Sequence, residues 1–200
     1  MNRDDETIST GRRTLLGGIG TLTLTAGAVS LLAACQSGRS ATPAAGAAVD
    51  AETDSATLNF ALGLEHEAVA AYQFALDSGV LRPEAQAVAS LFQGHHQGHR
   101  DALAATVAGL GAVPVEAKAM ADYAASLNVA SLASQNDVLA FARTLELQAA
   151  NAYLGAIPSL GDRELAKVAA RLAADETMHW TVLAQATGEP LPTGPLTFGA

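Results

Sequence analysis

The sequence predicts an all-α protein whose folded part is a four-helix bundle. Hydrophobic residues make up 50% of the 200-residue chain but aromatic residues only 4%, so most apolar side chains belong to alanine, leucine and valine. Alanine and leucine are strong helix formers, whereas runs of β-branched or aromatic residues of strand length are scarce. Beyond residue 54, apolar residues recur at the three- and four-residue spacing of one helical face. Together these observations favour helices packed on helices.

Four segments carry this helical spacing, and residues typical of turns separate them. Gly79 lies in a short turn between the first two, and Pro158 lies in a short turn between the last two. Between the pairs runs a long connection, residues 111–133, with a short helix expected near 118–126. This order predicts two antiparallel helix hairpins joined by a long crossover. We expect the four helices at residues 55–78, 83–110, 134–157 and 163–187.

Residues 1–34 have the features of a signal peptide. Arg12-Arg13 precede an apolar run rich in Gly, Thr and Ala, which ends in Leu32-Ala33-Ala34-Cys35. The paired arginines resemble a twin-arginine signal, with general secretion as the alternative. The last four residues resemble a bacterial lipobox, with an uncleaved membrane anchor as the alternative. We therefore expect export to the periplasmic or cell-envelope face of a membrane, inner or outer, and a lipid anchor on Cys35.

Two segments beside the predicted bundle, which spans residues 55–188, have compositions that do not favour a packed core. Residues 35–54 are mostly Ser, Gly, Pro, Ala and Thr, and they are expected to form a flexible tether. Residues 189–200 contain three prolines and are expected to form an extended tail. The folded domain is thus expected to be held off the membrane by its lipidated tether.

The two halves of the bundle resemble each other in sequence. Glu65 and Tyr72 of the first helix recur as Glu146 and Tyr153 of the third, shifted by 81 residues. His99 of the second helix recurs as His179 of the fourth, shifted by 80 residues. Such a repeat predicts a pseudo-twofold bundle in which equivalent residues of the two halves lie opposite each other.

Polar residues interrupt the apolar face of each helix near its middle. A carboxylate in an apolar interior carries a desolvation penalty of several kcal/mol, and divalent cations relieve it because carboxylates and imidazoles are their ligands. Alternatively, tyrosines or Arg143 can satisfy buried glutamates without metal. His66, Glu67 and His95 are expected to be solvated. The inward-facing residues that we expect to be able to bind metal are Glu65, His96, His99, Glu146, Glu176 and His179.

Residues 56–187 resemble a bacterial ferritin-like domain family of the ferritin superfamily. The resemblance is carried by residues 58–65 through Tyr72, by residues 145–156, and by Glu176-Thr177-Met178-His179. It implies a ferritin-like bundle in which each of two helices supplies a Glu and each of the others a Glu-x-x-His pair. Carried over, the implied metal ligands are Glu65, His96, His99, Glu146, Glu176 and His179, with Tyr72 and Tyr153 donating hydrogen bonds behind them.

This chain departs from the family pattern at one position. The second helix has His96-Gln97-Gly98-His99 where the pattern has Glu-x-x-His, so a neutral imidazole replaces a carboxylate. A standard di-iron oxidase is therefore in doubt. A single metal, a mixed site and a scaffold that has lost the chemistry all stay open.

Two functions from different classes follow from the sequence. The first is an envelope protein that binds a pair of iron or manganese ions for redox or metal-handling chemistry, with zinc or copper also open. If it is an enzyme, it is a di-metal oxidoreductase acting on peroxide or oxygen. The second is a metal-free scaffold that acts as a structural or binding lipoprotein. The net charge of -9 and the lack of Lys/Arg clusters argue against nucleic acid as a partner, and we expect a monomer or a homodimer.

Overall fold

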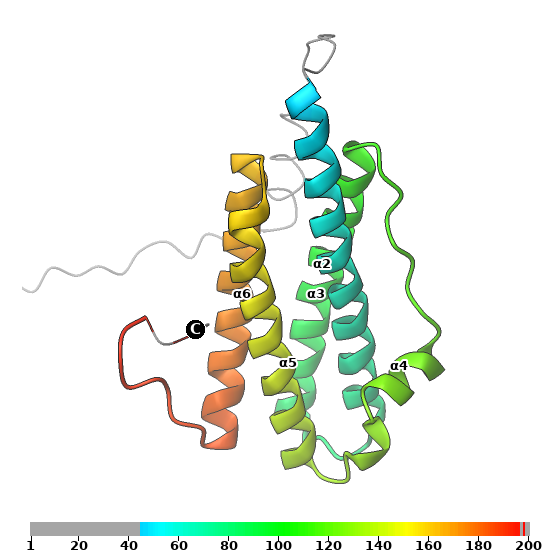
Figure 1. The fold of residues 1–200 in the computed structure, drawn as a ribbon. Helices are drawn as coiled ribbons and strands as arrows, with labels where there is room; N and C mark the ends of the chain where they lie inside the picture. Colours follow the sequence, from blue (N-terminus) through cyan, green and yellow to red (C-terminus); the bar gives the residue numbers. More distant parts are fainter. Residues whose placement is uncertain (1–44, 197, 199–200) are drawn as a thin grey trace, which may run out of the picture. The chain divides into compact units, whose positions relative to one another are not determined.

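The computed structural model describes residues 45–196 and 198, and the elements in this part of the chain are all helical (Figure 1). Four long helices make up the bundle, and the short helix α4 lies in the connection between its halves. The predicted all-α four-helix bundle is confirmed. The elements are α2 (Ala45–Asp77), α3 (Pro83–Gly109), α4 (Met120–Ser126), η2 (Val129–Ser131), α5 (Gln135–Ala156), η3 (Ile157–Ser159) and α6 (Arg163–Thr187).

The helices form two hairpins, as the turn residues predict. α2 packs mainly against α3, and α5 packs mainly against α6. Gly79 and Gly188, which follow α2 and α6, have φ values of 71° and 72°, a conformation in which a side chain would be strained. The Ser134 hydroxyl accepts a hydrogen bond from the Asp137 N–H and so caps the start of α5.

The first helix begins earlier than the sequence analysis predicts. α2 starts at Ala45, so the assignment of residues 45–54 to a flexible tether is wrong, and the rest of the predicted tether lies outside the described residues. Two causes are visible. Alanine-rich sequence has a high helix propensity. The buried Asp54 carboxylate also accepts hydrogen bonds from the Gly161 and Asp162 N–H groups, at 2.7 and 3.1 Å, which ties this end of α2 to the start of α6.

The long connection between the halves is fastened to α2. The Asn59 side chain donates to the Val113 carbonyl and accepts from the Val115 N–H, both at 2.8 Å. His66 Nε2 lies 3.1 Å from the Val115 carbonyl oxygen, so this ring faces the connection rather than the bundle interior. The paired bonds fix the register of the crossover against the helix.

The core consists of two apolar clusters with charged residues between them. One cluster includes Leu58, Leu62, Leu103 and Val107, and the other includes Phe92, Leu81, Val138 and Leu183. Along all four helices, the residues between these clusters include buried glutamates and histidines. The apolar clusters therefore shield a polar layer from water on both sides along the bundle axis.

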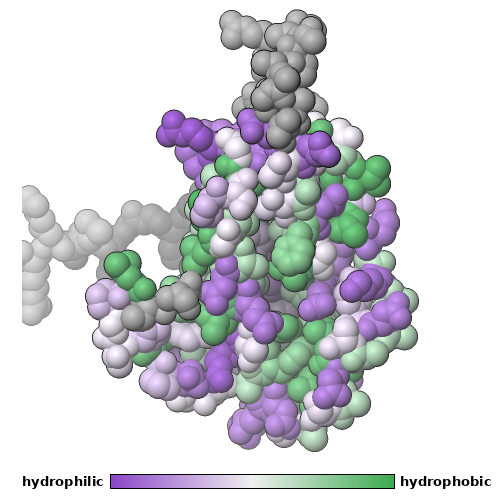
Figure 2. All heavy atoms as spheres, viewed as in Figure 1, coloured by the Kyte–Doolittle hydropathy of each residue, from purple (hydrophilic) through white to green (hydrophobic). Residues whose placement is uncertain are grey.

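The surface in Figure 2 mixes hydrophilic and hydrophobic side chains. Phe60 and Val113 are among the exposed apolar residues, with 68% and 83% of their surfaces accessible. Apolar groups thus lie in water while acids lie inside, which makes the polar layer the unusual feature of the fold. Within the part of the chain that the structure describes, no helix is both long and apolar enough to cross a membrane.

Replacing Asp54 should loosen the contact between α2 and the α5–α6 turn. Asp54→Ala leaves two N–H groups without their acceptor, and we expect it to lower the free energy of unfolding by about 1–3 kcal/mol. Urea denaturation measures the change. The exposed Glu52 provides the matched control, since Glu52→Ala removes an acid from the same helix. Equal stability of the two variants would contradict the role assigned to Asp54.

Candidate metal centre

All four long helices contribute a charged or imidazole side chain to one interior point. The side chains of the six contributing residues are at most 2% exposed, except that of His99, which is 11% exposed. The structure therefore brings together every residue that the sequence nominates for metal binding. The contributors are Glu65 from α2, His96 and His99 from α3, Glu146 from α5, and Glu176 and His179 from α6.

His96 lies across the middle of this group. Its Nδ1 is 2.8 Å from Glu65 Oε2, and its Nε2 is 3.2 Å from Glu146 Oε1. A carboxylate only accepts hydrogen bonds, so a ring that faces one on each side carries a proton on each nitrogen. In this arrangement His96 is an imidazolium that links glutamates from the two hairpins.

Two tyrosines close the centre from α2 and α5, and each bonds the glutamate of the other helix. The Tyr72 hydroxyl donates to Glu146 Oε1, and the Tyr153 hydroxyl donates to Glu65 Oε1. This crossed pairing is what the pseudo-twofold repeat requires, because Glu65 corresponds to Glu146 and Tyr72 to Tyr153. Each tyrosine fixes one oxygen of its glutamate. Arg143 instead contacts Thr187 and Glu189, away from the centre.

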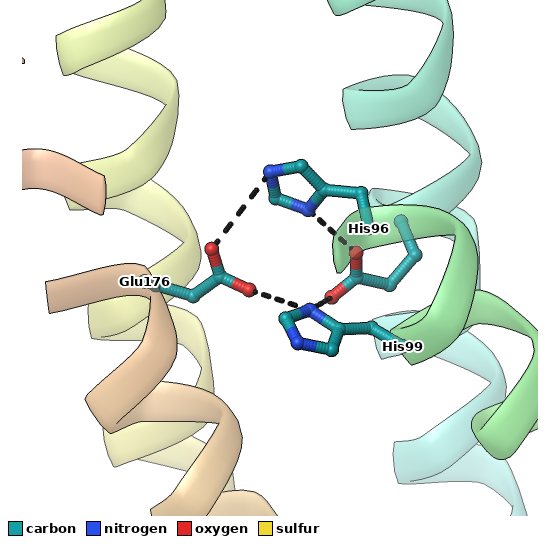
Figure 3. A group of neighbouring side chains, drawn as sticks. His96, His99 and Glu176 are labelled. Atoms are coloured by element: carbon teal, nitrogen blue, oxygen red, sulfur yellow. Dashed lines mark hydrogen bonds and ion pairs between the residues drawn. The ribbon is translucent and has the colours of Figure 1, made fainter. Parts of the chain in front are cut away.

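Two buried polar atoms of the centre lack a hydrogen-bond partner. His99 Nδ1 and Glu176 Oε1 lie 3.1 Å apart, close enough for an ion pair, yet neither makes a hydrogen bond. Figure 3 shows His96 and His99 facing Glu176 across the space between α3 and α6. A buried polar atom without a partner costs about 1–3 kcal/mol, and coordination of an ion removes that cost.

The histidines also have partners on their outer sides, which the sequence analysis missed. His99 Nε2 lies 3.3 Å from Asp175 Oδ2, and His179 Nε2 lies 2.9 Å from His95 Nδ1. His95 and Asp175 are equivalent positions of the two halves, 80 residues apart, and each contacts a histidine of the other half. The sequence repeat could therefore have identified both residues. His95 is exposed, as expected, but its ring is hydrogen-bonded to the centre. A partner on the outer nitrogen fixes the orientation of a ligating imidazole.

The close packing of acids and imidazoles shifts their pKa values in opposite directions. Burial by itself raises the pKa of Glu65, but hydrogen bonds and charge from His96 and His99 outweigh it and lower that pKa to about 2. Burial opposes protonation of His96, but Glu146 and Glu65 raise its pKa to about 10. Burial raises the pKa of Glu176, the least exposed of the three acids. The centre thus stabilises the ionised forms of Glu65 and His96 through each other, whereas burial disfavours the ionised form of Glu176.

The donor atoms fall into two overlapping groups that fit a metal ion. The first pocket consists of Glu65, His96, His99 and Glu176, and the second pocket consists of His96, Glu146, Glu176 and His179. Within each pocket, one donor atom from every residue lies within 4.8 Å of the others. Each pocket offers two carboxylates and two imidazoles, a set that suits transition metals such as iron, manganese and zinc. The residues therefore fit a metal ion, and His96 and Glu176 belong to both pockets.

The fold and this centre define a ferritin-like helical bundle with a potential metal site. The ferritin-like domain family matches residues 53–189, so the chain belongs to that family. A conserved hypothetical protein of Mycobacterium tuberculosis, known from its crystal structure, has a similar fold with a TM-score of 0.53 and 16% identity. The match covers 74% of this chain and 99% of that one. No curated protein matches the chain significantly.

The ion pairs predict how pH changes the stability of protein stripped of metal with a chelator. The pKa of His96 is raised from 6.5 to about 10, so its contribution is complete below pH 6.5 and is lost as pH rises through 10. The pKa of Glu65 is lowered from 4.5 to about 2, so its contribution is complete above pH 4.5 and is lost as pH falls through 2. We expect the free energy of unfolding, measured with urea, to fall steadily between about pH 6.5 and 10.

A variant that lacks the central imidazole should lose part of this dependence, because the pKa values of His99 and His179 are raised as well by the neighbouring carboxylates. His96→Gln removes the proton that links the two glutamates, whereas His66→Gln changes a histidine that faces the crossover. A profile of unfolding free energy that falls equally in both variants would show that the centre does not cause the pH dependence.

Proposed function

We propose that this protein is an envelope-anchored, ferritin-like metalloprotein that binds iron or manganese for redox or metal-handling chemistry. The observation that carries the proposal is the pair of orphaned atoms, His99 Nδ1 and Glu176 Oε1, inside a pocket of four potential ligands. A closed network of ion pairs gives every buried atom a partner. Two atoms with free electron pairs that face each other without a hydrogen bond are suited to bind a cation between them.

The surroundings of the centre suit a bound ion. Tyr72 and Tyr153 fix one oxygen of Glu146 and Glu65, which leaves the second oxygen of each glutamate directed at the histidines. The apolar clusters above and below exclude bulk water, which strengthens the electrostatic attraction between ion and ligands. A bound iron or manganese ion would supply redox or Lewis-acid chemistry, and the chain would hold its ligands in place.

A metal-free scaffold is the second candidate, and a specific observation favours it. Glu65 and Glu146 each contact an imidazole and a tyrosine hydroxyl, so most of the charge in the centre is already compensated. Such a network stabilises a unique packing of the four helices. In this second function, His99 Nδ1 and Glu176 Oε1 are paired by charge alone and still lack a hydrogen bond.

The anchor is part of the proposal and rests on the sequence. Cys35 follows the lipobox-like Leu32-Ala33-Ala34, and residues 1–44 lie outside the described part of the chain. A lipid on Cys35 would place the domain near a membrane surface after export by the twin-arginine or the general route. The twin-arginine route suits a protein that acquires its metal before export.

Metal analysis tests the proposal directly. Protein purified from its native compartment should contain iron or manganese, and added metal should raise its melting temperature. Glu176→Ala removes a ligand of both pockets and should abolish binding, whereas Glu67→Ala, on α2 outside the centre, should not. Less than about 0.2 equivalents of iron, manganese, zinc or copper, with unchanged melting on adding metal, would favour the scaffold.

The lipid anchor is tested by fractionation of the native host. Cys35→Ser removes the thiol that carries the lipid, and we expect the protein to move from the membrane fraction to the soluble fraction or to remain unprocessed. Ser37→Ala, two residues away, should leave the distribution unchanged. A Cys35→Ser protein that is processed and still fractionates with membranes would contradict the assignment of the lipid to this residue.

A further inference from the structure

The two pockets depend on the same imidazole, but on opposite sides of its ring. His96 Nδ1 faces Glu65, a member of the first pocket only. His96 Nε2 faces Glu146, a member of the second pocket only. An ion in the first pocket would therefore use Nδ1, and an ion in the second pocket would use Nε2.

Imidazole and carboxylate differ in how many ions they can serve. A neutral imidazole has one nitrogen with a free electron pair, because the other nitrogen carries the proton. A carboxylate has two oxygens with free electron pairs, so Glu176 can present Oε1 toward His99 and Oε2 toward His179 at the same time. Glu176 can thus serve both pockets together, whereas neutral His96 serves only one of them.

The charge of the centre leads to the same result. The three buried carboxylates supply three negative charges against the four positive charges of two divalent ions, so the fourth positive charge has only the half-exposed Asp175 as a counterion. An unpaired charge in an apolar interior is strongly disfavoured. A single divalent ion leaves one negative charge, which Tyr72 and Tyr153 lessen by donating hydrogen bonds to Glu146 and Glu65.

The pockets also differ in what an ion must displace. In the first pocket, His99 Nδ1 and Glu176 Oε1 have no hydrogen bonds to lose, so an ion displaces their ion pair and one hydrogen bond, that between His96 Nδ1 and Glu65. In the second pocket, His179 Nδ1 lies 3.3 Å from Glu146 Oε2 and 3.2 Å from Glu176 Oε2, and both hydrogen bonds must break. The Asp175 carboxylate on the outer nitrogen of His99 adds to the basicity of that ligand, whereas His179 has the imidazole of His95.

We infer that the centre is a tight site for a single divalent ion, held by Glu65, His96, His99 and Glu176, and that occupation of this pocket disfavours a second ion because His96 cannot serve both. The inference rests on the proposed function, since it assumes that the six residues bind metal. In addition, His96 converts a site for a pair of ions into two pockets that compete for the same imidazole.

Titration of the metal-free, full-length protein with Co(II) alone tests this inference, with visible absorption and calorimetry as readouts. The wild-type protein should bind one equivalent tightly and any second at least about tenfold more weakly. His96→Glu restores a carboxylate able to serve both pockets and balances the charge of two ions, so it should bind two equivalents with similar affinity. Gln97→Glu, which adds the same charge at an exposed neighbouring position, should still bind one.

Two matched variants identify the pocket that fills first. His99→Ala removes a ligand of the first pocket only, and it should weaken binding of the tight equivalent by at least about tenfold. His179→Ala removes a ligand of the second pocket only and should retain that equivalent. Circular dichroism establishes that both variants are folded, and this pair tests the inference even if His96→Glu does not fold.

The outcomes separate this inference from the proposed function. Two equally tight Co(II) ions in the wild-type protein would overturn the inference and leave the metalloprotein proposal intact. Loss of the tight ion in His179→Ala but not in His99→Ala would also overturn it. If folded wild-type protein binds no Co(II), both the proposed function and the inference fail.

Discussion

The burial of three glutamates at the midpoint of an apolar bundle is the constraint on which the rest of this structure depends. Each carboxylate must be compensated locally, because desolvation of an isolated charge costs several kcal/mol. The compensation comes from a different helix in every case: Tyr153 and His96 for Glu65, Tyr72 and His96 for Glu146, and for Glu176 an ion pair with His99 that has no hydrogen bond. These contacts connect the two hairpins, so the same residues that define the centre also fix how the halves of the bundle pack.

Much of the fold was predictable because it depends on local patterns. The helical spacing of apolar residues and the turn residues between the helices predicted bounds for α3, α5 and α6 that differ from the structure by about one residue. The start of α2 was predicted wrongly for two reasons: the helix propensity of the alanine-rich segment was underweighted, and the carboxylate of Asp54 is held by N–H groups more than a hundred residues away in sequence. No local pattern contains that contact.

The residues of the centre were also predictable from local patterns, but only some of the contacts between them were. A polar residue inside an apolar stripe identifies Glu65 or Glu176 from sequence alone. The crossed pairing of tyrosines with glutamates follows from the repeat once the halves face each other. The repeat also relates the outer contacts of His95 and Asp175. The missing hydrogen bonds of His99 and Glu176 depend on side-chain geometry between helices that sequence does not specify. Those geometric details carry the argument for a cation.

The central claim is that an ion occupies the space between His99 and Glu176. Anomalous X-ray diffraction at the iron and manganese absorption edges, from crystals of protein purified from its native compartment, tests it most directly. The account predicts an anomalous peak about 2.0–2.3 Å from His99 Nδ1 and from an oxygen of Glu176, the distance range of metal–ligand bonds. A fully refined centre with no peak at either edge, in which His99 and Glu176 are hydrogen-bonded to each other or to water, would contradict it.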